Sequence, residues 1–465
     1  MNGDIIAAIA TPPGVGALGV VRLSGENCEK VLEKIFTGRP SGGFVSRKMY
    51  HGRITDGGKT VDEVMCAVYR APRSYTKEDS AEIFTHGGFQ ATHGVLNAAL
   101  NNGARQALPG EFTQRAFLNG RMDLSQAEAV AELIHAKSEA ARSAGLRQLG
   151  GGISRAVGAF RDRILKWLAS IALSIDYPEH ESEALNLSAI QSECGILLPE
   201  MRKLADTYKA GKIITEGVRA VITGRPNVGK SSLLNAILKE DRAIVTEIPG
   251  TTRDVLTEPV SVRGVPLLLA DTAGMRETSD ILESRGVDKS REYVNGADLV
   301  LWVLDGSQPP QKEDYDIAVV LRGKKVIPLL NKRDLPRAGE WARMGSATDP
   351  ANSGFFETGE EPVPVSARTG EGLNALYEKI EEIFLSGLGA NAAEADMLTR
   401  ERHFILLNSA LDSLTEASAA IGSGFTEDLV SVHLTEAYHS LGEILGQNVG
   451  EDILDRIFSE FCVGK

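Results

Sequence analysis

The sequence feature that most constrains the fold is the run GRPNVGKS at residues 224–231, which fits the pattern GxxxxGKS. An apolar run at residues 218–222 precedes it, and an apolar helical stretch at residues 233–237 follows it. A strand, a glycine-rich turn and a helix in this order place backbone N–H groups around phosphates, with Lys230 reaching the β and γ oxygens and the Ser231 hydroxyl binding Mg²⁺. The flanking elements therefore predict a nucleotide-binding α/β domain.

The pattern of the chain changes on both sides of this motif. Around it, short apolar runs alternate with helical stretches, as in the βαβ units of a doubly wound, mainly parallel sheet. Before and after that region the pattern is helical, which favours an α/β domain inserted into a discontinuous helical domain. Apolar runs split by Gly and Pro indicate a small α+β domain at the start. We expect domains at residues 1–120 (α+β), 121–214 (helical, first part), 215–387 (inserted) and 388–465 (helical, second part).

Two helix boundaries can be predicted from local signals. Ser125 and Glu128 have the spacing of a capping box, in front of apolar residues with a helical period. A helix should therefore start at Ser125, and a later helix should cover about residues 188–209.

Composition limits the classes of partner and compartment. The 465 residues carry 50 Lys and Arg against 63 Asp and Glu. This excess of acidic residues excludes a large, uniformly positive surface that clamps nucleic-acid phosphates. The four cysteines lie far apart without a CxxC pair, which fits a reducing compartment. The uncharged residues 5–21 are broken by Pro12 and Pro13 and lack a basic leader, so neither a membrane span nor a signal peptide is indicated. We expect a cytoplasmic protein.

Three further motifs identify the nucleotide. The run DTAG at residues 271–274 follows an apolar strand, where Asp271 can hold Mg²⁺ through water and the Gly274 N–H can sense the γ-phosphate. In the run NKRD at residues 331–334, a carboxylate can accept both guanine N1–H and N2–H, a pattern that adenine lacks. The run SAR at residues 366–368 can contact the guanine base on the side of its O6 atom. Four motifs in this order predict GTP and resemble the translation-factor-like GTPases.

Two departures from Ras-like switches narrow the mechanism of hydrolysis. Met275 stands where a water-orienting Gln is usual, and it cannot polarise water. Glu283 is the nearest candidate for that task, although a solvated carboxylate at a helix start explains it equally well. Asn227, together with loop carbonyls in residues 246–251, could hold a monovalent cation where an arginine finger would otherwise lie, and Thr252 is the expected Mg²⁺-contacting threonine.

The residues expected to contact GTP are Asn227, Val228, Gly229, Lys230, Ser231, Ser232, Thr246, Glu247, Ile248, Pro249, Gly250, Thr251, Thr252, Asp271, Thr272, Ala273, Gly274, Asn331, Lys332, Asp334, Ser366, Ala367 and Arg368.

Motifs along the whole chain resemble one family closely, the MnmE (TrmE) tRNA-modification GTPases. The runs that carry this resemblance are ATPPG at 10–14, RLSG at 22–25, THGG at 85–88, PGEFTQRAFLNGRMDL at 109–124, the GTPase motifs and FCVGK at 461–465.

The resemblance implies an activity and a set of partners. It implies a homodimer whose first domain binds a tetrahydrofolate one-carbon donor, in the 5-formyl or methylene form, and a GTPase domain activated by K⁺-dependent dimerisation. It also implies an MnmG (GidA) flavoprotein partner, which brings FAD. With it the complex would add an aminomethyl or carboxymethylaminomethyl group to C5 of the wobble uridine of tRNA.

The same resemblance assigns site residues. The folate-contacting positions are Arg22, Glu82, Arg121 and Lys465, and Arg121 stands where the family more often has Lys. The K⁺ site is Asn227, Thr246, Ile248 and Thr251, and the Mg²⁺ site is Ser231 and Thr252.

Cys462 has two readings, a catalytic cysteine or a buried structural one on the last helix. Residues 137–166 carry seven basic and two acidic residues, which are either a tRNA-facing patch or a solvated helix face.

Two alternatives belong to other classes. A ribosome-assembly GTPase of the Era or Der kind shares the P-loop Asn and the GTTRD run, but it would need a KH-type GxxG element or a second GTPase repeat. A dynamin-like scaffold would need a membrane-binding segment. Neither feature is evident in the sequence, and folate binding by the N-terminal domain would separate the possibilities.

Overall fold

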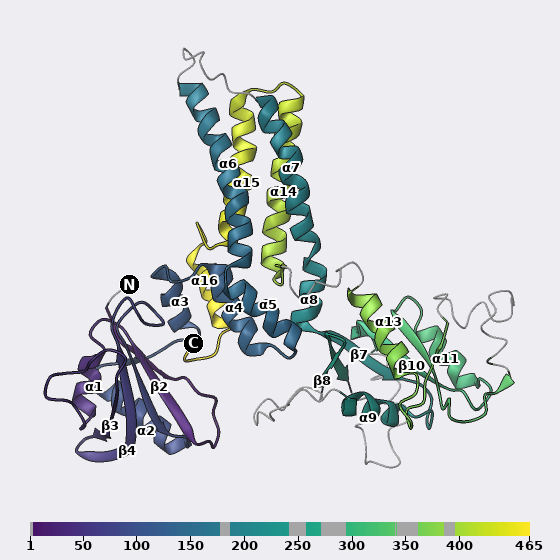
Figure 1. Ribbon diagram of the computed structural model, residues 1–465, viewed down its shortest axis with the longest axis horizontal. Helices are drawn as coiled ribbons and strands as arrows, with labels where there is room; N and C mark the ends of the chain where they lie inside the picture. Colours follow the sequence, from purple (N-terminus) through teal and green to yellow (C-terminus); the bar gives the residue numbers. More distant parts are fainter. Residues whose placement is uncertain are drawn as a thin grey trace. The chain divides into compact units, whose positions relative to one another are not determined.

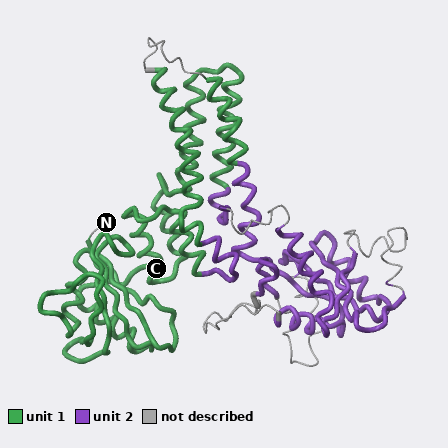
Figure 2. The backbone as a smooth tube through the Cα atoms, in the orientation of Figure 1, with its two compact units in different colours: residues 1–134, 146–201, 405–465 green, residues 135–145, 202–404 purple. Residues whose placement is uncertain are grey.

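The computed structural model describes residues 3–176, 187–240, 257–270, 294–339, 341, 361–385 and 396–465. Its chain forms two compact units (Figure 2). The first contains residues 1–134, 146–201 and 405–465, and the second contains residues 135–145 and 202–404. The first unit is thus assembled from segments on both sides of the second.

The first unit begins with a six-stranded sheet in the order β3-β4-β5-β2-β1-β6, antiparallel except for the β1–β6 pair. Val21 and Leu23 of β2 point into a buried cluster that also contains side chains of α1 and α2. Alternate residues point to the opposite face, where Ile6 and Ala8 pack with Phe112. The elements are β1 (Ile6–Ile9), β2 (Leu18–Ser24), α1 (Glu29–Ile35), β3 (Met49–Asp56), β4 (Lys59–Tyr69), β5 (Ser80–His86), α2 (Phe89–Asn101) and β6 (Arg105–Gln106).

Helices complete the first unit, and four long ones run side by side, namely α6, α7, α14 and α15 (Figure 1). α6 packs on α15, and the Arg161 guanidinium lies 4.2 Å from the Tyr438 ring centroid. Segments before and after the inserted region therefore pack together, as predicted. The helices that lie mostly in this unit are α3 (Glu111–Leu118), α4 (Leu124–His135), α6 (Gly152–Asp176), α7 (Leu187–Asp206), α14 (Glu401–Gly422), α15 (Glu427–Ile444) and α16 (Glu451–Ser459). α5 (Glu139–Leu149) is divided between the units, with residues 139–145 in the second.

Both predicted helix boundaries need correction. The capping box before α4 is formed by Asp123 and Gln126: the Gln126 N–H donates to Asp123 Oδ1 at 3.0 Å, and the Asp123 N–H donates to Gln126 Oε1 at 3.0 Å. The helix starts at Leu124, one residue before Ser125, so the predicted capping pair of Ser125 and Glu128 was wrong. The helix expected over about residues 188–209 is α7, which ends at Asp206; Thr207 follows it before α8, and the Thr207 hydroxyl accepts a hydrogen bond from Leu398 N.

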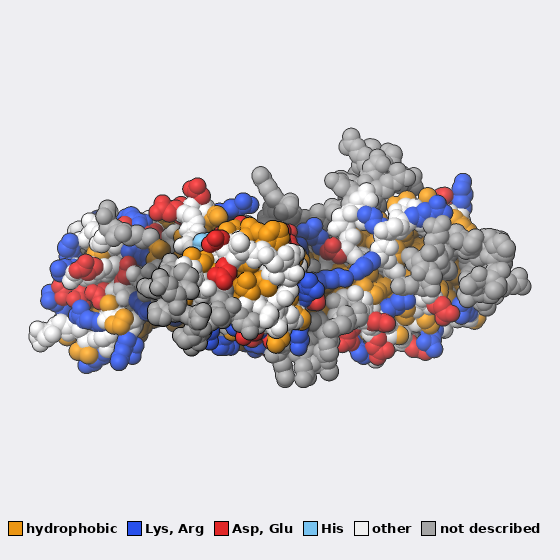
Figure 3. Space-filling model, turned by 90° about the horizontal axis from the view of Figure 1, so that it is seen from above, with side chains coloured by type: hydrophobic (Ala, Val, Ile, Leu, Met, Phe, Trp, Pro, Cys, Tyr) orange, Lys and Arg blue, Asp and Glu red, His pale blue; other side chains and the backbone are white. Residues whose placement is uncertain are grey.

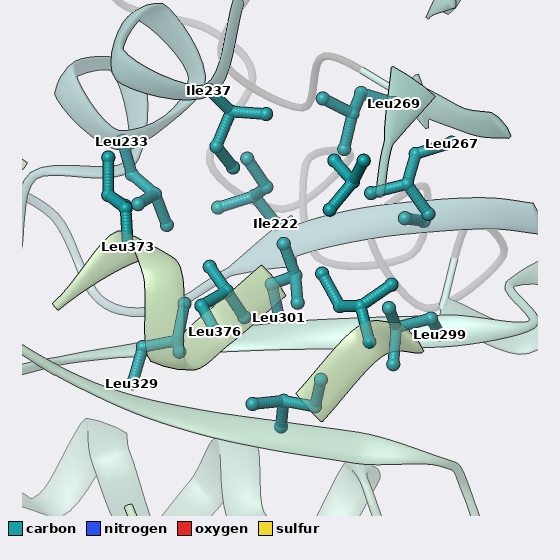
Figure 4. Close-up of a cluster of buried hydrophobic side chains, with 14 of the residues drawn as sticks. Ile222, Leu233, Ile237, Leu267, Leu269, Leu299, Leu301, Leu329, Leu373 and Leu376 are labelled. Atoms are coloured by element: carbon teal, nitrogen blue, oxygen red, sulfur yellow. The ribbon is translucent and has the colours of Figure 1, made fainter. Parts of the chain in front are cut away.

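The second unit holds a six-stranded sheet in the order β12-β11-β10-β7-β9-β8, parallel except for the β8–β9 pair. One face packs against α9 and α13, with Leu233, Ile237, Leu373 and Leu376 in a shared apolar layer (Figure 4). The other face packs against α11. Because every residue of β10 is buried, the sheet is covered on both sides, which confirms the doubly wound prediction. The elements are α8 (Tyr208–Glu216), β7 (Val218–Thr223), α9 (Lys230–Glu240), β8 (Thr257–Val262), β9 (Val265–Ala270), β10 (Leu299–Asp305), α11 (Lys312–Val320), β11 (Val326–Asn331), β12 (Val363–Pro364) and α13 (Leu373–Leu385).

The described surface mixes charges of both signs, and on the face seen in Figure 3 basic and acidic side chains are interspersed. Within residues 137–166, Arg161 is buried, Arg163 pairs with Glu200 at 2.7 Å, and Arg142 pairs with Glu139. These cations do not form one solvated face, because one of them lies in the core. None of the described helices is both long and apolar enough to span a membrane.

Candidate functional site

The P-loop connects the end of β7 to the start of α9 and needs glycine at two positions. Gly229 has a φ of 99°, and a Cβ there would lie 2.3 Å from Asn331 Nδ2. A Cβ at Gly224, whose φ is 149°, would lie 2.3 Å from the Val303 carbonyl oxygen. The loop therefore packs directly on the strand ends of β10 and β11, where a side chain would not fit.

Lys230 lies within this loop. Its ammonium donates to the carbonyl oxygens of Gly224 at 2.7 Å and of Arg225 at 2.8 Å. Burial lowers the pKa of Lys230, since removal from water disfavours the charged form. Among its predicted neighbours, Val228 is buried, whereas Asn227 and Ser232 are exposed. The described part of the predicted phosphate-binding loop thus holds the Lys230 ammonium against the loop's own backbone.

One amide side chain brings three predicted motifs together. Asn331 Nδ2 donates to the Val228 carbonyl at 2.7 Å, and Asn331 Oδ1 accepts from Ala367 N at 2.9 Å. Asn331 therefore ties the P-loop to the SAR loop across the edge of the sheet, at the carboxyl ends of its parallel strands. Open parallel sheets bind ligands at this edge.

The Asp334 carboxylate is held by that same loop. Ser366 Oγ donates to Asp334 Oδ1 at 2.7 Å, and Arg368 pairs with Oδ2 at 2.8 Å. The Ser366 hydrogen bond holds the pKa of Asp334 below its ordinary value. The carboxylate therefore stays ionised, which is the state needed to accept two N–H groups of a base.

The remaining predicted GTP contacts lie outside the described residues. These are residues 246–252, residues 271–274, and Glu283. Consequently Asn227 is the one member of the predicted K⁺ site that the described chain places, and Ser231 is the one member of the predicted Mg²⁺ site.

A second candidate site lies on the sheet of the first unit. Arg22 of β2 and Glu82 of β5 are partners in the strand register. Arg22 donates from Nε and Nη2 to Glu82 Oε1, at 3.0 and 2.8 Å, and the Tyr69 hydroxyl donates to Glu82 Oε2 at 3.2 Å. The pair is mostly buried, on the face opposite α1 and α2.

The C-terminal tail joins this pair. Arg22 Nη1 donates to the Gly464 carbonyl at 3.3 Å, and Val463 forms a β-bridge with Pro109. Gly464 has a φ of 95°, and a Cβ there would lie 2.4 Å from the Ile9 carbonyl oxygen, so a side chain would clash. Burial, and secondly the charge of Arg22, lower the pKa of Lys465. The tail thus places Lys465 beside Arg22.

Tyr75, which the sequence reasoning missed, lies at the centre of this group. Its ring centroid lies 5.2 Å from the Arg22 guanidinium carbon and 4.5 Å from that of Arg121. Arg121 Nη1 also donates to the Tyr75 carbonyl at 2.7 Å, and the Tyr75 hydroxyl bonds with that of Thr113 at 2.9 Å. The structure therefore brings all four predicted folate positions, Arg22, Glu82, Arg121 and Lys465, to one place. Tyr75 is an aromatic residue in a loop, outside any periodic apolar pattern, so the sequence did not indicate its role.

Cys462 differs from the other cysteines. Its thiol is exposed and lies beyond the end of α16, so the reading as a buried structural cysteine was wrong. Burial raises the pKa of Cys66 and Cys194 to about 12, and it raises that of Cys28 as well, which makes those three thiols unreactive.

Comparisons with known proteins cover the whole chain. The MnmE helical domain matches residues 124–462, and the N-terminus of the GTP-binding protein TrmE matches residues 5–121. The chain is 43% identical to the tRNA modification GTPase MnmE of Geobacillus kaustophilus (strain HTA426), over 99% of both chains. It is 42% identical to the protein of that name from Lactococcus lactis subsp. lactis (strain IL1403), over 99% of this chain and 98% of the relative. The chain therefore belongs to the MnmE (TrmE) family of tRNA modification GTPases.

Proposed function

We propose that this protein hydrolyses GTP as part of the modification of tRNA. The Asn331 bridge is the observation that carries the GTP assignment, because it joins a phosphate-binding loop to a base-reading loop at one sheet edge. Family membership supports the tRNA part of the proposal.

Each nucleotide-binding residue has a separate task in this proposal. Lys230 exchanges its two carbonyl partners for β and γ phosphate oxygens, and the backbone of residues 227–232 surrounds the phosphates. Ser231 contributes an oxygen ligand to Mg²⁺, which neutralises charge on the phosphates when bound. Asp334 accepts guanine N1–H and N2–H, and the Ser366 hydroxyl orients that carboxylate.

We infer that the second site binds a tetrahydrofolate derivative. Three cations, Arg22, Arg121 and Lys465, oppose one carboxylate, which suits an anionic glutamyl tail. Glu82 accepts N–H groups of the pterin, and the Tyr75 ring offers a flat apolar surface to it. The exposed thiol of Cys462 lies on the same tail as Lys465, so it is available for chemistry near this site.

We also propose the partners and product that family membership suggests. The protein would act as a homodimer with an MnmG-type flavoprotein, which brings FAD, and install an aminomethyl or carboxymethylaminomethyl group at C5 of wobble uridine. Nucleoside mass spectrometry of tRNA from a strain lacking the protein, with and without the restored gene, tests this. Unchanged wobble nucleosides in the deficient strain would contradict the product assignment.

The Arg22→Ala variant should bind folate about 30-fold more weakly, since one charge-assisted contact to an anionic ligand is lost. Calorimetric titration of the full chain with 5-formyltetrahydrofolate measures the affinity. Arg39→Ala is the matched control, because Arg39 pairs with Glu33 on the exposed surface of the same sheet domain. Equal affinity in Arg22→Ala and Arg39→Ala would place the folate site elsewhere.

A second folate prediction concerns Tyr75. Tyr75→Leu should weaken 5-formyltetrahydrofolate about fivefold to tenfold, because two guanidinium groups lose the ring that positions them. Tyr75→Phe keeps the ring and loses only the hydroxyl bond to Thr113, so it should retain most of the affinity. If the leucine and phenylalanine variants bind folate equally, the ring has no such role.

A further inference from the structure

Three charged side chains beside the P-loop, Arg225, Asp305 and Asp314, have no part in the proposed chemistry, and one of them pairs with Lys332, a predicted GTP contact. Arg225, the second residue of the loop, approaches two carboxylates: its Nη2 lies 3.8 Å from Asp305 Oδ2, and its Nε lies 3.4 Å from Asp314 Oδ2. Lys332 Nζ pairs with the same Asp305 oxygen at 2.6 Å. Asp305 is therefore shared by a cation of the phosphate-binding loop and a cation of the NKRD run.

The two carboxylates of this group are buried and Arg225 is mostly buried, whereas the Lys332 side chain is 30% exposed. The side chains of Asp305 and Asp314 are 2% and 1% exposed, and that of Arg225 is 11% exposed. Burial alone would raise the pKa of Asp305, but hydrogen bonds from Lys332 and Ser307 outweigh it and lower the pKa. Removing one partner of a buried charge group leaves the other uncompensated. We therefore expect a change at Arg225 to alter how Asp305 holds Lys332.

Arg225, Asp305 and Lys332 all lie at the same edge of the sheet, next to the ends of its strands. Asp305 ends β10 and is the register partner of Asn331 on β11, directly before Lys332. Arg225 follows Gly224, which packs against the Val303 carbonyl of β10 without room for a side chain. Lys332 itself has a φ of 65°, a left-handed turn that sets the direction of the chain toward Asp334.

We propose that Arg225 is a positioning residue that couples the phosphate-binding loop to the guanine-reading loop through Asp305 and Lys332. Arg225 and Lys332 both approach Asp305 Oδ2, so this one carboxylate oxygen links the two cations. With both cations in place, the left-handed turn at Lys332 keeps the Asp334 carboxylate in the position from which it accepts the N–H groups of the base. This inference rests on the proposed base-reading role of Asp334.

The test compares two nucleotides that differ only at the position Asp334 reads. IDP lacks the 2-amino group of GDP, so the ratio of their affinities reports base reading and not phosphate binding. In the full chain, competition with a fluorescent nucleotide should show that Arg225→Ala lowers the GDP-over-IDP preference about threefold to tenfold, the range typical of residues in one network. Asp305→Asn should lower it similarly, and the double variant no further than the larger single effect. Arg263→Ala is the matched control, because Arg263 pairs with Glu378 and Glu381 on the exposed side of α13.

Each outcome decides the proposal. If Arg225→Ala weakens GDP and IDP by the same factor, or changes neither, the residue serves the phosphates or the fold alone and the coupling is refuted. Additive effects in the double variant would also refute it. If the alanine variant does not fold, Arg225→Lys decides, since its single ammonium cannot engage both carboxylates and a full GDP preference would then contradict the coupling. A parent protein without a GDP preference would instead overturn the base-reading role of Asp334.

Discussion

Asp334→Asn is expected to weaken GTP binding by about 100-fold or more and to make xanthosine triphosphate the preferred nucleotide. In its proposed role the carboxylate accepts the N1–H and N2–H groups of guanine, whereas an amide presents a donor there. Xanthine carries a carbonyl oxygen in place of the 2-amino group, so the amide N–H gains an acceptor. Ser366 and Arg368, which now bind Asp334, would remain to orient the new side chain.

Competition binding of the two triphosphates measures this exchange of preference. Asp316→Asn is the matched control, because it makes the same chemical change on the exposed face of α11. A variant that still prefers GTP as strongly as the parent would show that another group reads the base. Loss of both nucleotides without a switch would point to a folding defect, which thermal unfolding of the variant and the control can separate.

The nucleotide site could be predicted from sequence because each of its motifs is local. The spacing of Gly224, Gly229 and Lys230 sets the loop, and the apolar runs before and after it set the strand and the helix. What sequence could not supply was the contact between motifs. The Asn331 amide bridge to Val228 spans 103 positions, and the shared Asp305 oxygen depends on strand register.

The residues of the proposed folate site follow from the family resemblance, because no local sequence pattern predicts that they come together. Arg22 and the tail carbonyl of Gly464 are 442 positions apart, and no periodicity relates them. Tyr75 was missed for the same reason, because its importance comes from two arginines that tertiary contacts bring to its ring. The start of α4 was misplaced because Asp123 and Gln126 form the same box two residues earlier than Ser125 and Glu128.

Potassium is expected to accelerate GTP hydrolysis about 100-fold more than sodium, if a held cation replaces an arginine finger. Asn227 is the residue of the predicted K⁺ site that the described chain places, exposed on the P-loop. Asn227→Ala should abolish the difference between the two salts while nucleotide binding changes little. Because Asn227 has a φ of 63°, Asn227→Gly is the better test, since glycine keeps this conformation and removes only the amide.

Asn235→Ala serves as the control for these variants, because Asn235 is exposed on α9 outside the loop. Single-turnover rates in matched K⁺ and Na⁺ buffers measure the effect. Equal rates in both salts for the parent protein would end the cation hypothesis. A glycine variant that keeps the full K⁺ stimulation would remove Asn227 from it.

Glu283 offers the complementary test, because a GTPase must orient water as well as neutralise charge between the β and γ phosphates. Met275 cannot polarise water, so we expect Glu283→Ala to lower kcat about 100-fold in K⁺ with little change in GTP affinity. That pattern marks an interaction made chiefly in the transition state. Glu283→Gln separates the two readings of this residue: an amide can still orient water by hydrogen bonding, so partial recovery of kcat favours that role. If Glu283→Ala keeps the parental kcat, Glu283 is only a solvated carboxylate at a helix start. Another residue must then orient the water.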